Sequence, residues 1–385
     1  MATSSPELHR VAAAAPPFAT RIVAWQRVHG RHDLPWQNTR DPYRVWLSEI
    51  MLQQTTVAAV IPYYQRFLAA FPALDALAAA PIERVMELWS GLGYYSRARN
   101  QHRCAQMVTA EHRGEFPRDV DAIAGLPGIG RSTASAIAAF CFGASTPILE
   151  GNAKRVLARH AGIEGYPGES AVATTLWKIA EQRMPHDDVD AYTQGMMDLG
   201  ATVCTRSKPS CMVCPVSSDC VALATHRVEQ IPATRPKRVL PQRAVTMLMM
   251  IRHDSVLLER RPPSGIWGGL WSLPELPDDV DAIRYCNDRF DARIELEPQL
   301  PAIEHGFTHY RLTIRPQPCA VKSRGLRAEE PGLLWMPLMD AAGAALPSPI
   351  RRLLVGWSAK VMSADPDDPE RECVAADASR SQHPG

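Results

Sequence analysis

Residues 126–138 read LPGIGRSTASAIA, the short stretch that most clearly indicates a local structure, a hairpin followed by a helix. Gly128 and Gly130 let the backbone turn sharply, and the residues from Arg131 onward have the composition of a good helix. Backbone N–H groups at the start of a helix, together with the helix dipole, favour a bound anion. The stretch therefore predicts a hairpin that binds a nucleic-acid backbone phosphate. An ordinary corner between two helices is the alternative, and the pattern does not separate the two.

The flanking sequence separates into a helical part and a mixed part. Residues 18–225 carry apolar side chains at helical spacing, broken by Pro and Gly, which predicts an all-α domain. Residues 244–355 hold short strand-like runs around one helix, which predicts an α+β domain. The stretches of helical period include Pro42–Phe71, Ile82–Gln106, Ser132–Phe142 and Ala171–Arg183. One helix is expected at Val280–Phe290, and the expected strands are Ala244–Ile251, Val256–Glu259 and Tyr310–Ile314.

Length and composition agree with a multidomain globular protein. A chain of 385 residues is too long for one ordinary domain. Hydrophobic residues at 46% and charged residues at 22% exclude global disorder and fibrous structure. No apolar run reaches the ~18 residues of a membrane span, and the apolar patch Val11–Ala15 is too short for a secretory signal. We therefore expect a cytoplasmic protein.

Composition also suggests where the domains begin and end. We expect a flexible N-terminus (1–17), a helical domain (18–225), a linker (226–243), an α+β domain (244–358) and a disordered tail (359–385). The net charge of the chain is +1, but the linker HRVEQIPATRPKRVLPQR carries +4 with three prolines, whereas residues 244–385 carry −4. This extended basic segment fits a phosphate-contacting linker and a plain solvated tether equally well.

Four of the nine cysteines are clustered at Cys204, Cys211, Cys214 and Cys220. Four thiolates at this spacing suit one metal centre. A disulfide framework does not fit an odd cysteine count without a signal peptide. Structural zinc and a [4Fe–4S] cluster both accept four thiolates, so the spacing leaves both open. We expect most of the others to be small buried side chains: Cys104, Cys141, Cys286, Cys319 and Cys373.

Glu49 lies in the predicted helix VWLSEIMLQQT, residues 45–55, with apolar neighbours one turn away. Val45, Trp46 and Leu52 share its side of the helix, which is the wrong face for a solvated glutamate. A carboxyl in apolar surroundings has a raised pKa and can hold a proton near neutral pH. Glu49 is therefore a candidate general acid, and a surface glutamate whose stem covers apolar residues is the alternative.

Six motifs together resemble the MutY family, the adenine DNA glycosylases of the helix-hairpin-helix superfamily. They are SEIMLQQT (48–55), GLGYYSRARN (91–100), LPGIGRSTA (126–134), GNAKRVLAR (151–159), MMDLGATVC (196–204) and the four-cysteine array. The resemblance covers about residues 18–355. It implies an all-α helix-hairpin-helix glycosylase domain with an iron–sulfur cluster loop, followed by a Nudix-like α+β domain.

The resemblance implies a monofunctional enzyme of base excision repair. Such an enzyme hydrolyses the N-glycosidic bond of adenine opposite 8-oxoguanine or guanine in duplex DNA, acts as a monomer and, in a bacterium, is associated with the nucleoid. Its cofactor is a [4Fe–4S] cluster, which is not the catalyst but shapes a basic loop. Arg206 and Lys208 then contact phosphates. The implied cluster ligands are Cys204, Cys211, Cys214 and Cys220.

Two carboxylates carry the implied chemistry. Glu49 matches the family's general acid. Glu150 occupies the position of its second catalytic carboxylate, which is aspartate in the family. The extra methylene matters because about 1 Å of misplacement can lower a rate strongly. Asn152, in the same motif, is also a candidate N-cap for a helix that starts at Ala153.

Further residues match DNA-contacting positions of the family. Gln54 matches the residue inserted near the lesion pair, and Tyr94, with Leu92, matches the intercalating group. Ser132 stands where endonuclease III-like enzymes carry a Schiff-base lysine. No lysine precedes Lys154, so a lyase built on that position is excluded. The remaining backbone-contacting candidates are Gly128, Gly130, Ser132 and Asn152.

The C-terminal part resembles the start of a Nudix fold at residues 260–275, RRPPSGIWGGLWSLPE. The next segment, DDVDAIRYCNDRF from Asp278, lacks the acidic cluster with which Nudix hydrolases bind magnesium, so we expect a reader domain. The family's lesion-reading loop matches Phe307, Thr308 and His309. The alternatives are a catalytically weak, cluster-containing mismatch binder, motivated by Glu150, and another helix-hairpin-helix glycosylase specificity.

Overall fold

The computed structural model describes residues 16–236, 239–262, 265–307, 309–325 and 330–364. Most of the expected N-terminal segment and tail, residues 1–15 and 365–385, lies outside this range. The chain divides into two compact units, one made of residues 1–79 and 100–237 and the other of residues 80–99 and 238–385. No helix in the described part is long and apolar enough to cross a membrane.

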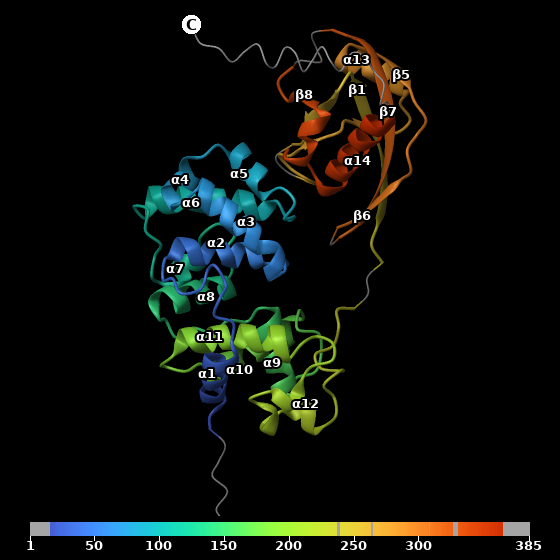
Figure 1. Cartoon of the computed structure of the whole chain (residues 1–385). Coiled ribbons are helices and arrows are strands. Elements are labelled where there is room, and N and C mark those ends of the chain that lie inside the picture. Colours follow the sequence, from blue (N-terminus) through green and yellow to red (C-terminus); the bar gives the residue numbers. More distant parts are fainter. Residues whose placement is uncertain (1–15, 237–238, 263–264, 308, 326–329, 365–385) are drawn as a thin grey trace, which may run out of the picture. The chain divides into compact units, whose positions relative to one another are not determined.

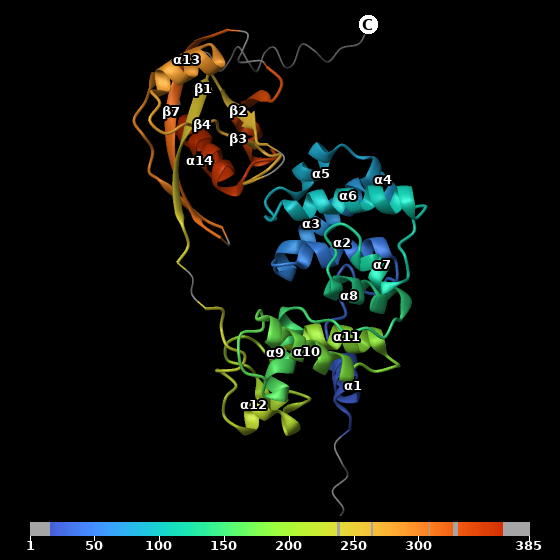
Figure 2. The ribbon, with the colours of Figure 1, turned by 180° about the vertical axis from the view of Figure 1, so that it is seen from behind.

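Helices build the first unit, as the sequence predicted. Figures 1 and 2 show them in two groups, with α2, α3, α4, α6, α7 and α8 in one and α1, α9, α10, α11 and α12 in the other. Their bounds are α1 Phe18–His29, α2 Pro42–Leu52, α3 Val57–Ala70, α4 Leu74–Ala79, α6 Ser96–Glu111, α7 Val120–Ala124, α8 Arg131–Phe142, α9 Gly151–Ala161, α10 Ser170–Gln182, α11 Val189–Asp198 and α12 Val221–Ala224. A short π-helix, Leu199–Val203, continues α11.

Helix α2 begins where the sequence chemistry dictates. The Asp41 carboxylate accepts a hydrogen bond of 2.9 Å from the backbone N–H of Tyr43, and Pro42 occupies the first helical position, where no N–H is needed. The side chains of Trp46 and Met51 are fully buried, and α2 packs against α8. This packing fixes the rotation of α2 and hence the direction of Glu49.

The start of helix α9 corrects one prediction. The helix begins at Gly151 and not at Ala153, and its N-cap is Glu150 and not Asn152. The Glu150 carboxylate accepts hydrogen bonds from the backbone N–H groups of Asn152 (2.7 Å) and Ala153 (2.8 Å). The physical reason is that an acidic side chain two residues earlier satisfies the first unpaired N–H groups of the helix.

The second unit is α+β. Strand order in its mixed sheet is β3-β2-β1-β7-β5, with β4, β6 and β8 paired to β1, β7 and β2. Helix α14 lies against the sheet in Figures 1 and 2. The strands are β1 Gln242–Arg252, β2 Ser255–Arg260, β3 Trp271–Ser272, β4 Glu275–Leu276, β5 Ala292–Leu296, β6 Ile303–Gly306, β7 Arg311–Arg324 and β8 Leu333–Pro337, and the helices are α5 Ile82–Trp89, α13 Ala282–Phe290 and α14 Ser348–Ala364.

Strand β7 is much longer than the predicted run Tyr310–Ile314. It pairs in parallel with β1, with Val245 opposite Ile314. Pro316 and Pro318 obscured the pattern because proline has no N–H to donate to a sheet. Their carbonyl oxygens still accept hydrogen bonds, at 3.1 Å each, from the N–H groups of Leu300 and Glu297.

The core of each unit confirms the expectation for four scattered cysteines. Cys104 and Cys141 are buried in the first unit, and Cys286 and Cys319 in the second. The last two pack with Phe290 of α13 against the sheet. Cys373 lies outside the described residues.

Candidate active site

A cavity of about 500 Å³ opens in the helical unit. Its walls come from the segment between α1 and α2, from α2 itself, from α8 and from α11. The lining includes the ring of Trp36, the imidazole of His32 and the carboxyl of Glu49. This volume is typical of a small-molecule site, for which ~300–1,000 Å³ is usual.

Glu49 has the properties expected of a general acid. Its side chain is half-buried at the cavity wall. Burial raises the pKa of Glu49 to about 7, and the negative charge of Glu150 acts in the same direction. The carboxyl therefore carries a proton for a substantial part of the time at neutral pH.

Glu150 is held firmly at the end of the segment that follows α8. Each of its carboxylate oxygens accepts one N–H at the start of α9. One residue earlier, the N–H of Leu149 donates to the hydroxyl of Ser132, at 2.9 Å. Burial raises the pKa of Glu150, and the two N–H bonds oppose this shift. The sequence-predicted residues Ser132, Glu150 and Asn152 thus lie together at one point of the fold.

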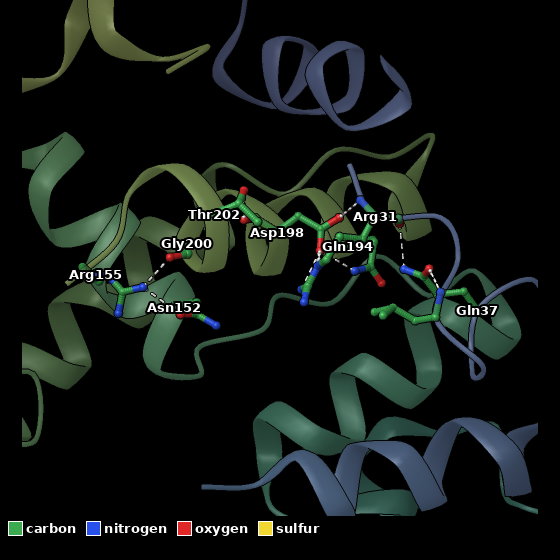
Figure 3. A network of polar contacts seen from close by, with 9 residues as sticks. Arg31, Gln37, Asn152, Arg155, Gln194, Asp198, Gly200 and Thr202 are labelled. Carbon is green, nitrogen blue, oxygen red and sulfur yellow. Dashed lines mark hydrogen bonds and ion pairs between the residues drawn. The ribbon is translucent and has the colours of Figure 1, made fainter. Parts of the chain in front are cut away.

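A polar network that sequence reasoning missed stabilises the opposite wall (Figure 3). Asp198 is fully buried and accepts hydrogen bonds from the backbone N–H of Arg31 (2.9 Å), its Nε (2.8 Å) and the amide of Gln194 (2.8 Å). Gln37 donates to the carbonyl oxygen of Arg31, at 2.9 Å. The only sequence signal was Asp198 within the motif MMDLGATVC, where an acidic residue stands in an otherwise apolar stretch.

A second network joins α9 to the cysteine loop. Arg155 donates to the side chain of Asn152 (2.7 Å) and to the carbonyl oxygens of Gly200 (2.6 Å) and Cys204 (2.7 Å). Figure 3 shows Arg155 between Asn152 and Gly200. The helix that Glu150 caps is thereby tied to the first cysteine of the array.

The hairpin has the geometry that its glycines predicted. Gly128 has a φ of +78°, and a Cβ at this position would lie 2.7 Å from the Cβ of Asn100, so only glycine fits. Gly130 is the N-cap of α8. Both glycines are exposed, which leaves the hairpin open to a ligand.

The other DNA-contacting candidates differ in exposure. Gln54, just after α2, is exposed and has a φ of +58°. Tyr94 is 47% exposed with a φ of +49°, whereas Leu92 is buried. Tyr95 is buried, as expected for a core residue. Arg206 and Lys208 are exposed on the loop between the first two cysteines of the array.

A second cavity, of about 580 Å³, lies in the unit that contains the sheet. Tyr94 and His309, which are 215 positions apart in the sequence, both line it, together with Arg99, Trp267 and His305. The structure therefore brings together two residues that the family resemblance linked to lesion recognition. Thr308 lies outside the described residues.

The four clustered cysteines line a common small cavity together with apolar side chains such as Val203 and Leu223. All four are half-buried free thiols, and burial raises the pKa of Cys214 to about 11. Arg159 donates to the Cys204 sulfur at 3.4 Å. Among the described residues no three His, Cys, Asp or Glu side chains are arranged to hold a metal ion.

Comparison with known proteins agrees with both halves of the chain. Residues 47–182 match the HhH-GPD superfamily of base excision DNA repair proteins, and residues 246–355 match the NUDIX domain. An adenine DNA glycosylase of Buchnera aphidicola subsp. Acyrthosiphon pisum is 34% identical over 346 residues, which cover 89% of this chain and 98% of that protein. This chain belongs to the adenine DNA glycosylase family. It is a DNA-binding hydrolase of base excision repair that acts on N-glycosyl bonds.

Other relatives fit this assignment. The human adenine DNA glycosylase is 31% identical over 415 residues, covering 91% of this chain and 76% of the human protein. A solved structure of a thermostable thymine-DNA glycosylase superposes with a TM-score of 0.50 at 29% identity, covering 54% of this chain and 95% of that one. The helix-hairpin-helix and Nudix-like fold predicted from the sequence is thereby confirmed.

Proposed function

We propose that this enzyme releases adenine mispaired with 8-oxoguanine or guanine in duplex DNA, with Glu49 as general acid and Glu150 as the second carboxylate. The observation that carries the proposal is a glutamate with a pKa of about 7 at the wall of a cavity of about 500 Å³, close enough to a second carboxylate for their charges to interact. Pairs of carboxyls with different environments commonly divide acid and charge-stabilising roles.

The substrate base must first leave the helix, because its glycosidic bond cannot be reached inside a stacked duplex. The cavity offers Trp36 as an apolar face for a purine ring. Gln194 gives its amide N–H to Asp198, which leaves the amide oxygen to accept from the N6 amino group of adenine. Guanine has a carbonyl oxygen at the equivalent place, so this acceptor favours adenine.

The chemical step requires a good leaving group and a stabilised sugar cation. Protonated Glu49 donates its proton to N7 of adenine, which makes the base a better leaving group. Glu150 places negative charge near the oxocarbenium-like sugar. Its two N–H bonds at the start of α9 fix the carboxylate in spite of the longer side chain. Glu49, once deprotonated, helps deliver the attacking water.

The enzyme binds the sugar–phosphate backbone of the DNA. The exposed hairpin of Gly128 and Gly130 leads into the N-terminus of α8, where N–H groups and the helix dipole suit a phosphate. Arg206 and Lys208 add exposed positive charge from the cysteine loop. Because such contacts release counterions, the affinity should fall steeply with salt.

The second cavity recognises the base opposite adenine. The exposed ring of Tyr94 can stack against a base, and His309 provides a ring N–H for a base edge. The strand and loop residues around His305 and Phe307 have no catalytic carboxylates among the cavity lining. This composition supports a reader of 8-oxoguanine and not a second hydrolase.

Cys204, Cys211, Cys214 and Cys220 would hold the [4Fe–4S] cluster. The four thiols line one small cavity, and four thiolates from one short segment are what a [4Fe–4S] cluster requires. When bound, the cluster would join the four thiolates and so would hold the loop of Arg206 and Lys208 in one arrangement. Arg159, which is buried and donates to the Cys204 sulfur and to the carbonyl oxygen of Thr205 (2.7 Å), supports the loop from α9.

A single-turnover assay of the full-length enzyme tests the proposal. Duplexes with A·8-oxoguanine, A·G, A·T and T·G pairs should release adenine from the first two only, fastest opposite 8-oxoguanine. Tight binding of the mispairs without base release would instead identify a mismatch-binding protein with weak catalysis. This alternative is considered because Glu150 stands where the family has aspartate. Release of a different base would assign another specificity.

A further inference from the structure

The loop that carries Tyr94 belongs to the same compact unit as the sheet. Residues 80–99 group with residues 238–385, although about 140 positions separate the two segments. Tyr94 has a left-handed backbone conformation that a bulky residue adopts only when its surroundings enforce it. The contacts that hold this loop therefore decide how Tyr94 is presented.

One set of contacts fastens the start of the loop to the segment before α14. The Ser90 hydroxyl lies 3.3 Å and 3.2 Å from the carbonyl oxygens of Ala344 and Leu346, and Tyr95 donates to Leu346 at 3.4 Å. Arg351, on α14, donates to the Ser90 hydroxyl and, at 2.7 Å, to the Ala344 carbonyl oxygen. Ser90 is buried, so these bonds are shielded from water.

A second contact fastens the end of the loop to the cavity wall. Arg99, in the first turn of α6, donates to the carbonyl oxygen of Gly268 at 2.6 Å. Gly268 follows Trp267, which is buried and also has a left-handed backbone, with a φ of +54°. The Trp267 ring lies 5.7 Å from that of His305 and 5.8 Å from that of Phe307. Arg99 thus supports a strained residue that orders the cavity's aromatic wall.

We propose that Arg99 and Arg351 are positioning residues for lesion discrimination, since they bind the Tyr94 loop to the wall of the second cavity so that the two act as one rigid reader. This inference rests on the proposed recognition of 8-oxoguanine by that cavity. Neither arginine takes part in the adenine chemistry, whose cavity lies in the other unit. Their loss should therefore change the choice of opposite base more than the basal rate.

The test compares full-length Arg99→Gln and Arg351→Gln enzymes with the wild type. Single-turnover adenine release is measured on A·8-oxoguanine and A·G duplexes, with thermal unfolding as a check on folding. The ratio of the two rates should fall roughly tenfold in each variant, the scale of one lost base-edge contact, while the A·G rate changes little. Arg99→Lys, which keeps one donor for the Gly268 carbonyl, should recover part of the ratio.

Arg260→Gln is the matched control. It breaks the ion pair of Arg260 with Glu83, which joins the same two segments but is about half exposed at both ends, so the ratio should not change. An unchanged ratio in both test variants, or an equal fall of both rates with a lowered Tm, would overturn the inference. A wild-type enzyme with equal rates on the two duplexes would refute lesion discrimination itself, and the inference with it.

Discussion

The hydroxyl of Ser132 accepts a hydrogen bond of 2.9 Å from the backbone N–H of Leu149, the residue before Glu150. Ser132 lies in the first turn of α8, just after the hairpin, and Glu150 caps α9. One hydrogen bond therefore connects the end of the glycine hairpin to the residue that precedes Glu150. Ser132 thus holds the segment before α9 by a hydrogen bond, at the position where endonuclease III-like lyases carry lysine.

Ser132→Ala should lower the single-turnover rate of adenine release about three- to tenfold. The reason is that a lost neutral hydrogen bond costs about 0.5–1.5 kcal/mol and here lets Glu150 shift. DNA affinity should change less than the rate. Thr174→Ala is the control, because its hydroxyl donates within its own helix, to the carbonyl oxygen of Ser170. Equal losses in the two variants would contradict a specific role for Ser132.

Glu49→Gln should abolish adenine release while duplex binding survives. Losing a general acid costs roughly 10²–10⁴-fold, and more when the same group also positions water. In the wild type the rate should fall as pH rises through about 7, the pKa of Glu49. Single-turnover rates from pH 6 to pH 9 check this, with the exposed Glu111→Gln as control. More than a tenth of the wild-type rate in the glutamine variant would remove Glu49 from its role.

The same substitution should stabilise the fold at alkaline pH. The pKa of Glu49 is raised by burial from about 4.5 when unfolded to about 7 when folded. The folded state therefore binds more protons in this window, and its stability falls as pH rises from about 4.5 through 7. Above pH 7 the free energy of unfolding of the glutamine variant should exceed that of the wild type by about 1–3 kcal/mol. Below pH 4.5 the two free energies should be equal. Urea unfolding at pH 4.5 and pH 8 measures the difference, which must grow with pH.

Glu150→Asp and Glu150→Gln separate charge from reach. The glutamine variant keeps an acceptor for the N-terminal N–H groups of α9 but loses the negative charge, so its rate should fall about 100-fold. The aspartate variant keeps the charge and should retain activity within about tenfold of the wild type. Single-turnover rates of both variants on an A·8-oxoguanine duplex separate the effect of the charge from that of the side-chain length. A glutamine variant as fast as the wild type would show that no charge is needed at this position.

Enzyme purified without oxygen should be brown and contain about four irons per chain. The four cysteines surround one small cavity, and Arg159 donates to the Cys204 sulfur there. Iron and zinc analysis, with Cys214→Ser as the loss variant and the buried Cys286→Ser as control, measures the content. Stoichiometric zinc without iron would contradict the proposed cluster and would identify a structural zinc site instead.

Much of the architecture was readable from local sequence. Three local signals depend only on neighbours along the chain: helical spacing around Glu49, the glycines at 128 and 130, and the short strand-like run Ala244–Ile251. The structure has α2, α8 and β1 at those places. The four-cysteine array was legible for the same reason. The cap of α9 was misassigned because two candidate residues, Glu150 and Asn152, compete for the same N–H groups, and only backbone geometry selects one.

The assembled sites depend on contacts between distant segments, which no local pattern encodes. The ion pair of Arg31 with Asp198, 167 positions apart, supports the wall of the cavity that Glu49 lines. Tyr94 and His309 line one cavity, and hydrogen bonds from Arg99 to Gly268 and from Arg351 to Ser90 connect the two segments that carry them. The sequence thus determined which reactive side chains the protein has and where its local elements form. Their burial, their pKa values and their hydrogen-bond partners depend on tertiary packing, because desolvation and charge coupling depend on distances in three dimensions.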